Sequence, residues 1–228
     1  MWFIFIQILC RRIYEYLSDI SPNGKYFIYA ANKNGYVYTA ISYTTWIKPI
    51  SFWKNVRMRG GGIFLNDKEY VLYDGNYYNE FIYKDLEHVN KKLENGVYHE
   101  RLIRNHWSIK TKEEKTTTYC KQICENLELE KIFTRGNYQE GKGELSESHK
   151  LVYNDLTEEK PYWEWCEWTE NTLYWSEKGC LYKAQLEQNN KIGIESLIYD
   201  FNPEVFLNRE APYEKGNSSK HLPIKLKL

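Results

Sequence analysis

The stretch that decides the fold is SPNGKYFIYAANKNGYVYTAI, residues 21–41. A polar turn containing Gly24 precedes a run of aromatic and β-branched residues, and a second turn ending at Gly35 precedes another such run. Glycine and asparagine readily adopt the positive φ that tight hairpin turns require. The stretch therefore predicts two antiparallel strands joined by a short turn.

Two further stretches, residues 66–85 and 169–186, repeat this order of polar turn, strand run, glycine-containing turn and second strand run. A fainter copy lies at residues 145–154. The first two copies begin roughly 40 to 45 residues apart, which is a spacing typical of propeller blades. The sequence thus predicts a repeated, degenerate hairpin unit.

Residues 21–41 resemble the Ser-Pro-Asp-Gly-Lys hairpin of β-propellers of the WD40-like, TolB-type class, although the Gly-His and Trp-Asp signature of WD40 repeats is absent. The resemblance implies blades around an axis and no particular activity. We expect an all-β chain with an irregular β-propeller-like domain of about four to five antiparallel blades over residues 1–209. Residues 210–228 are expected to form a linker and a last edge strand or tail.

Three segments are less regular. Residues 116–133 carry apolar residues four apart but also a run of threonines, which favours extended structure. Residues 86–94 are expected to form a short helix or an ordered loop ending at Asn95-Gly96. Residues 1–17 leave a first strand, a helix and a truncated start open.

The composition excludes several classes of protein. Lysine plus arginine equals aspartate plus glutamate at 31 each, so no overall field attracts nucleic acid or an anionic membrane. The apolar start, residues 1–10, is too short to span a bilayer, which takes about 20 residues. Five cysteines, an odd number without framework spacing, indicate reduced thiols and a cytoplasmic protein. Without paired zinc-ligand spacing, we expect no metal and no cofactor.

The tryptophan-rich segment YWEWCEW, residues 162–168, is the first candidate site. In a regular strand Trp163 and Trp165 share one face, where they form a stacking platform for sugar rings or bases. The alternative is packing between neighbouring sheets. Glu164 and Glu167 are candidates for an acid–base pair of the glycosidase type, or else ordinary solvent-exposed carboxylates.

The string RMRGGG, residues 57–62, is the second candidate site. Successive amides of Gly60, Gly61 and Gly62 suit an anion nest with Arg57 and Arg59 beside it. The Gly-Lys-Ser/Thr ending of a P-loop is absent. The alternative is a bulge or tight turn that leads into the next strand.

No stretch supplies a nucleophile, a base and an orienting group together. We therefore expect a non-enzymatic binding or interaction module whose partner is another protein, without nucleic-acid binding. The alternative function is a glycan-binding or glycan-hydrolysing protein that uses the aromatic platform and the glutamates.

Overall fold

The computed structural model describes residues 13–33, 35–55, 60–73, 77–139, 143–154, 156–187 and 191–205. The chain forms two compact units. Unit 1 contains the described residues up to Arg104, and unit 2 comprises Asn105–Val205. The predicted domain over residues 1–209 stays a prediction, and the predicted tail from residue 210 onward lies outside the described residues.

The described part of the chain is all-β, as predicted, with four sheets and one helix. Nearly all strand pairs are antiparallel; the exception is the parallel pair β6–β8. Within the described residues the sheets close into neither a barrel nor a ring of blades. The β-propeller arrangement therefore remains a prediction.

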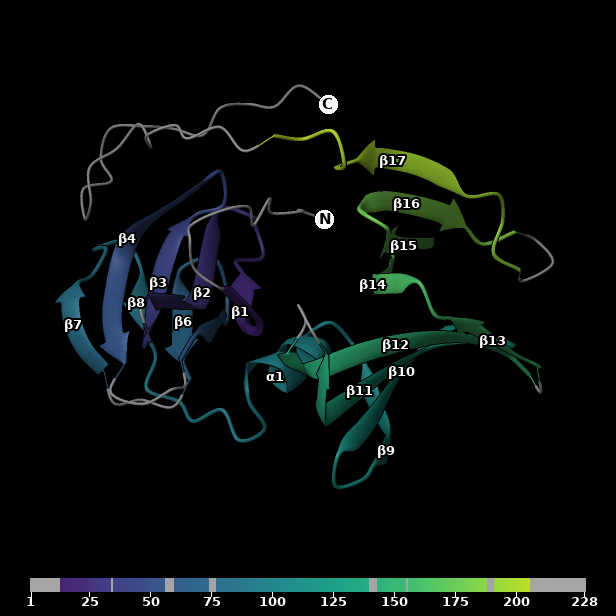
Figure 1. The fold of residues 1–228 in the computed structure, drawn as a ribbon, viewed down its shortest axis with the longest axis horizontal. Coiled ribbons are helices and arrows are strands. Elements are labelled where there is room, and N and C mark those ends of the chain that lie inside the picture. Colours follow the sequence, from purple (N-terminus) through teal and green to yellow (C-terminus); the bar gives the residue numbers. More distant parts are fainter. Residues whose placement is uncertain are drawn as a thin grey trace. The chain divides into compact units, whose positions relative to one another are not determined.

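The larger sheet of unit 1 is an antiparallel meander of β1 to β4, and β7 is added beside β4, which gives the order β1-β2-β3-β4-β7 (Figure 1). Its strands are β1 (Ile13–Ile20), β2 (Tyr26–Lys33), β3 (Tyr36–Tyr43), β4 (Trp46–Asn55) and β7 (Tyr77–Phe81). The predicted first hairpin is confirmed, because β2 and β3 pair from Tyr26↔Tyr43 to Lys33↔Tyr36. Gly35 has φ +84°, and its N–H donates to Asn32 Oδ1 at 3.0 Å.

The smaller sheet of unit 1 contains β5 (Gly62–Phe64), β6 (Glu69–Leu72) and β8 (Glu87–His88). The second predicted hairpin is therefore wrong: β6 pairs with β5 and β8, whereas β7 pairs with β4. The physical reason is burial, since Tyr70, Val71 and Leu72 of β6 are all buried and need cover on both faces. A hydrophobic run predicts a strand, but it does not specify which other strand pairs with it.

One helix, α1 (Val97–Arg104), follows Gly96 and was not predicted. The preceding residues 86–94 form the loop alternative, with β8 inside it. The helix buries Val97, Tyr98 and Leu102. At its last turn the Arg104 guanidinium binds the buried Asp19 carboxylate through two nitrogen–oxygen contacts of 2.7 Å.

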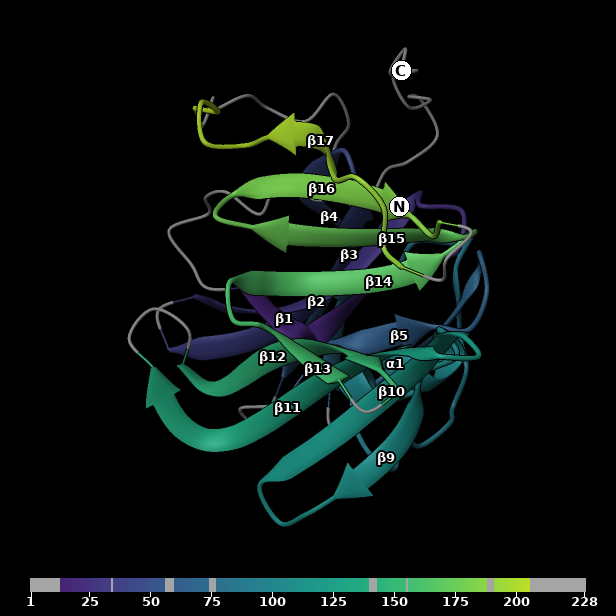
Figure 2. The same cartoon turned by 90° about the vertical axis from the view of Figure 1, so that its right-hand side faces the viewer.

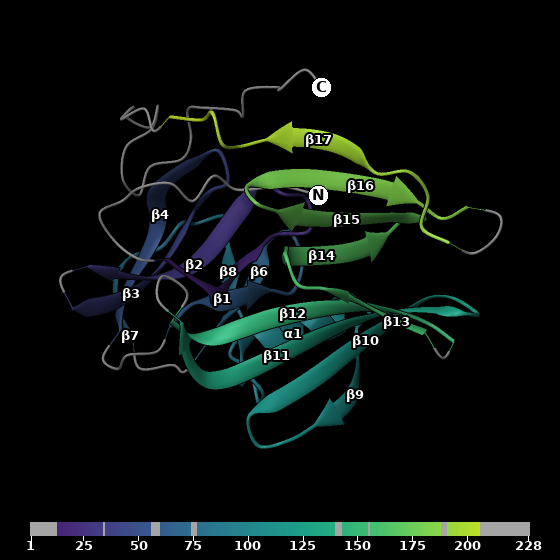
Figure 3. The same cartoon turned by 45° about the vertical axis from the view of Figure 1, so that its right-hand side comes forward.

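Unit 2 contains two antiparallel sheets (Figures 2 and 3). The first has the order β13-β12-β11-β10-β9, with β9 (Ser108–Lys112), β10 (Thr116–Cys124), β11 (Leu127–Gln139), β12 (Gly143–Tyr153) and β13 (Leu156–Lys160). The second has the order β14-β15-β16-β17, with β14 (Trp163–Thr169), β15 (Thr172–Glu177), β16 (Cys180–Gln185) and β17 (Ser196–Asp200). The strands β10 and β11 confirm extended structure for residues 116–133.

The third predicted hairpin is confirmed by β15 and β16, which pair from Thr172↔Gln185 to Glu177↔Cys180. Its turn residues Lys178 and Gly179 have φ +49° and +74°. Positive φ at two successive positions is what the favoured two-residue hairpin turn requires. The sequence signal and the structure agree here because the turn is purely local.

Candidate functional site

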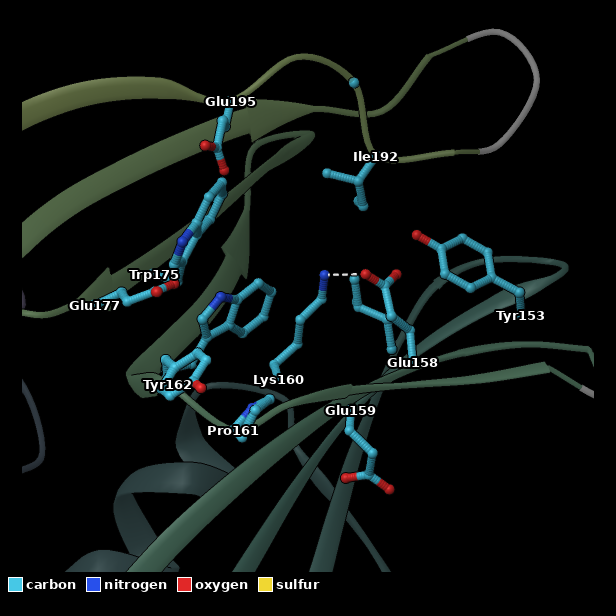
Figure 4. Close-up of a pocket in the computed structure, with 13 residues that line it drawn as sticks. Tyr153, Glu158, Glu159, Lys160, Pro161, Tyr162, Trp175, Glu177, Ile192 and Glu195 are labelled. Atoms are coloured by element: carbon cyan, nitrogen blue, oxygen red, sulfur yellow. Dashed lines mark hydrogen bonds and ion pairs between the residues drawn. The ribbon is translucent and has the colours of Figure 1, made fainter.

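Unit 2 contains a cavity of about 470 Å³ where β13 turns into β14 (Figure 4). Strands β12 to β15 and the loop at residues 192–195 line it. Four of its lining residues are aromatic, namely Tyr153, Tyr162, Trp163 and Trp175. A volume of this size lies within the range typical of ligand sites, about 300–1,000 Å³.

A bulge in β14 determines which tryptophan enters the cavity. Trp163 pairs with Glu177, yet Trp165 pairs with Ser176, so Glu164 is an extra residue. Opposite residues of an antiparallel pair share a face, and the neighbours Ser176 and Glu177 lie on opposite faces. Trp163 and Trp165 therefore lie on opposite faces, and the prediction that they share one is wrong.

The bulge places Trp163 in a column of rings across three strands. Trp163 stacks on Trp175 with ring centroids 5.2 Å apart, and Trp175 stacks on Tyr182 with centroids 5.6 Å apart. The Lys160 ammonium lies 5.2 Å from the centroid of the Trp163 ring. Both faces of Trp175 are thus covered, and the remaining face of Trp163 already holds a cation.

The charges around the cavity are unequal. Glu158, Glu177 and Glu195 line it. Lys160 forms a hydrogen bond with Glu158 (Figure 4), and Lys178 Nζ lies 3.5 Å from Glu177 Oε1. Glu159 lies on the other side of β13, 2.8 Å from the Lys150 ammonium. Among the described residues Glu195 has no ion-pair partner. Glu195 is therefore the one lining carboxylate that no ion pair of the described residues neutralises.

The predicted glutamates do not line this cavity. Glu164 is exposed at the bulge. Glu167 faces away from Trp163, and its carboxylate accepts hydrogen bonds from Lys121 Nζ at 2.6 Å and Trp107 Nε1 at 3.0 Å. A carboxylate held by these donors is a structural element of unit 2 and not half of an acid–base pair with Glu164.

The glycine string lies in unit 1, whereas the tryptophans lie in unit 2. Gly61 has φ +85°, and its N–H donates to Thr39 Oγ1 at 2.7 Å. A Cβ at this position would lie 1.8 Å from the Leu17 carbonyl oxygen. Gly60 and Gly62 are also buried. This geometry supports the alternative of a tight turn leading into a strand.

The arginines of the predicted anion nest, Arg57 and Arg59, lie outside the described residues, so the nest itself stays a prediction. The N–H of Gly61, one of the amides predicted to form the nest, already donates a hydrogen bond to Thr39 Oγ1.

Trp163 is the only lining residue that was among the predicted site residues; Lys160, Trp175 and Glu195 are three of those that were not. Trp175 had a signal in the sequence, because a two-residue turn at Glu170-Asn171 sets β14 against β15. Both turn residues have positive φ, +50° and +56°. Lys160 and Glu195 had no such signal, since their positions depend on packing between distant segments.

A second polar cluster of unit 2 is closed to solvent. Lys131 and His149 are 2% and 1% exposed. Glu147 Oε2 lies 3.6 Å from Lys131 Nζ and 3.3 Å from His149 Nε2. Burial lowers the pKa of His149, and burial also raises the pKa of the neighbouring Cys166 thiol. None of these groups lines the cavity described above.

In the described part of the chain no group of three His, Cys, Asp or Glu side chains is arranged to hold a metal ion. Cys120, Cys124, Cys166 and Cys180 are free thiols. Burial raises the pKa of Cys120 to about 11, so the neutral thiol is favoured there at neutral pH.

A comparison with known proteins gave no match to a family model, to a curated protein or to a solved structure. None of the described helices is long and apolar enough to cross a membrane. The geometry of the cavity is therefore the only guide to function among these observations.

Proposed function

We propose that this chain is a non-enzymatic interaction module on a β-propeller-like scaffold, and that the cavity of unit 2 receives a basic side chain of a partner protein. The consecutive antiparallel order of β14 to β17 supports the scaffold, because propeller blades are four-stranded meanders of this kind. The odd number of cysteines and the free thiols support a cytoplasmic location.

The observation that carries the proposal is the ammonium of Lys160 on the Trp163 ring. It marks the end of the aromatic column as a surface that attracts cations, with Glu158 and Glu195 beside it. A cation over a tryptophan gains about 0.5–1 kcal/mol when exposed and about 2 kcal/mol when desolvated. An incoming lysine or arginine side chain competes with Lys160 for this face of the Trp163 ring. It gains the carboxylate of Glu195, which has no ion-pair partner among the described residues.

Catalysis has less support. The cavity brings together carboxylates and aromatic rings but no serine, cysteine or histidine. Nucleophilic catalysis needs a nucleophile within hydrogen-bond reach of a base. Binding without turnover is the simpler use of this set of side chains.

Titration of the intact protein with N-acetyl-lysine amide and N-acetyl-arginine amide, followed by tryptophan fluorescence, tests the proposal. N-acetyl-norleucine amide is the uncharged control. We expect the cations to bind and Glu195→Gln to weaken them about fivefold, as loss of roughly 1 kcal/mol implies. Glu164→Gln is the matched control, because Glu164 is exposed in the same unit and does not line the cavity. Equal binding of norleucine amide, or equal effects of the two variants, contradicts the proposal.

A glycan-binding or glycan-hydrolysing function is the second candidate. It is favoured by Tyr162, which is 63% exposed and lines the cavity near Glu158 and Glu177. An exposed ring of this kind offers a face for stacking a sugar. Saturable oligosaccharide binding that is lost in Tyr162→Ala supports this candidate, and a glycan array without any binding removes it.

A further inference from the structure

Strand β17 is an edge strand with unusually apolar exposed residues. It pairs with β16, and its other edge is open within the described residues (Figure 2). Leu197, Ile198 and Tyr199 are 57%, 41% and 43% exposed. An open row of backbone N–H and C=O groups beside apolar side chains is a template for another strand.

The other edge strands of unit 2 are protected by charge. β9 carries Lys110 and Lys112, β14 carries Glu164 and Glu167, and β13 has the sequence LTEEK. Charged side chains, lysine above all, are the usual means by which proteins blunt a sheet edge. β17 has no lysine and no proline, and its only charge is Asp200 at its end. Its edge is the exception within unit 2.

From this contrast we propose that β17 binds an extended segment of a partner protein by strand addition, with lysine or arginine flanking an apolar centre. The charges of β17 select such a segment, because Glu195 precedes the strand and Asp200 and Glu204 follow its apolar centre. Strand addition takes its affinity from main-chain hydrogen bonds and its specificity from side chains. The proposal rests on the proposed function only in taking a protein as the partner.

The same charges disfavour a second copy of this chain. A symmetric antiparallel pair of β17 strands sets Asp200 of each copy beside the end of the other strand that carries Glu195 and Ser196. Like charges that face each other across strands destabilise the pair. A basic segment meets no such repulsion. Glu195 also lines the cavity, so one basic segment is suited to both surfaces.

The test uses the intact protein and the peptide acetyl-KVTVTVK-amide, with hydrogen exchange of residues 196–200 and calorimetric titration as readouts. We expect the peptide to bind and to protect these amides. A peptide with glutamate at both ends should bind at least tenfold more weakly because of charge, and one with N-methyl groups on its central backbone should do so because hydrogen bonds are lost. Unprotected β17 amides at saturating peptide overturn the proposal.

Matched variants separate this surface from the cavity. Ile198→Lys guards the edge and should weaken the peptide at least fivefold. Ile194→Lys introduces the same charge at a position that is 89% exposed and precedes the strand. It should weaken binding no more than about twofold, because it adds charge beside Glu195 without altering the strand edge. An equal loss of peptide affinity in both variants means that the added charge alone weakens binding, and it overturns strand addition.

The outcomes also distinguish the two proposals. If N-acetyl-lysine amide binds but the peptide does not protect the β17 amides, the cavity function is retained and strand addition is refuted. Protection by the peptide without any binding of the amide refutes only the cavity function. If the β17 amides become protected without peptide as the protein concentration rises, and the mass in solution doubles, the edge binds a second copy of the chain. That result overturns the proposal.

Discussion

Both units have apolar cores, but of the described residues only those of unit 2 include a buried lysine and a buried histidine. The core of unit 1 is built from aromatic and aliphatic residues, among them Tyr26, Ile41, Trp53 and Phe64. Unit 2 buries Lys131 and His149 beside Glu147 between its strands. A buried ion pair contributes little net stability, but removal of one partner leaves a charge without compensation. Unit 1 should therefore respond to changes of shape, and unit 2 to changes of charge.

The largest effect is expected for Gly61→Ala in unit 1. The new Cβ would lie 1.8 Å from the Leu17 carbonyl oxygen at φ +85°, so steric overlap adds to backbone strain. We expect a loss of about 4 kcal/mol in the free energy of unfolding of unit 1. Hydrogen exchange of residues 13–104 and of residues 105–205 measures the two units separately.

The matched control is Gly35→Ala. Gly35 has φ +84°, but nothing lies within 4 Å of its Cβ position, so only strain remains. Its loss should be about 1 kcal/mol. Equal losses in the two variants contradict the steric argument.

The next effect concerns the charges of unit 2. Lys131→Met should destabilise unit 2 by about 3 kcal/mol, because the Glu147 carboxylate, whose side chain is only 9% exposed, loses a cation in a desolvated site. Lys110→Met is the control: its ion pairs with Glu128 and Glu130 leave the lysine 42% exposed, so the loss should stay below about 1 kcal/mol. Urea unfolding followed by hydrogen exchange of residues 105–205 measures both. A Lys131 variant as stable as the Lys110 variant contradicts the contrast between the units.

The charged contact of unit 1 should matter less than the buried charges of unit 2. In Asp19→Asn the two-nitrogen contact with Arg104 is weakened, as is the 2.8 Å hydrogen bond from the Phe64 N–H. We expect a loss of about 2 kcal/mol, since Arg104 retains some solvent and the Phe64 oxygen as an acceptor. Asp67→Asn, at an exposed carboxylate that accepts one N–H from Asn23, should change stability by less than about 0.5 kcal/mol. Chemical unfolding of both variants provides the comparison.

The smallest effect is the pH dependence of unit 2. Burial lowers the pKa of His149 below 6.5, so the unfolded chain takes up a proton at a higher pH than the folded chain does. The groups that face His149 are the Glu147 carboxylate, the Lys131 ammonium and the Trp163 carbonyl. The stability of unit 2 should be fully present above pH 6.5 and fall as the pH drops below it. One proton limits the slope to about 1.4 kcal/mol per pH unit.

Exchange of residues 105–205 at several pH values between 5 and 8 measures this slope. His149→Gln should remove it. Partial desolvation also lowers the pKa of His88 in unit 1. Because much of the His88 side chain is exposed, the stability of unit 1 should depend less on pH than that of unit 2. A slope that survives in His149→Gln assigns the pH dependence to other groups.

The sequence predicted those features that depend on neighbouring residues. The turns at Gly35 and at Lys178-Gly179 were readable because positive φ is a property of one or two residues. The threonine run at the start of residues 116–133 indicated a strand because the preference of β-branched residues for extended backbone is also local. The hairpin expected at residues 66–85 failed because its two strands are assigned to different sheets by burial, which is a property of distant contacts.

The candidate site shows the same division. The sequence by itself determined that aromatic rings and carboxylates are concentrated at residues 158–177. Only the tertiary structure decided which of them meet. A single extra residue at Glu164 turns Trp163 towards Trp175 and Lys160 and turns Trp165 away. Because side chains alternate between the faces of a strand, one inserted residue exchanges the faces, and its position depends on packing rather than on local preference.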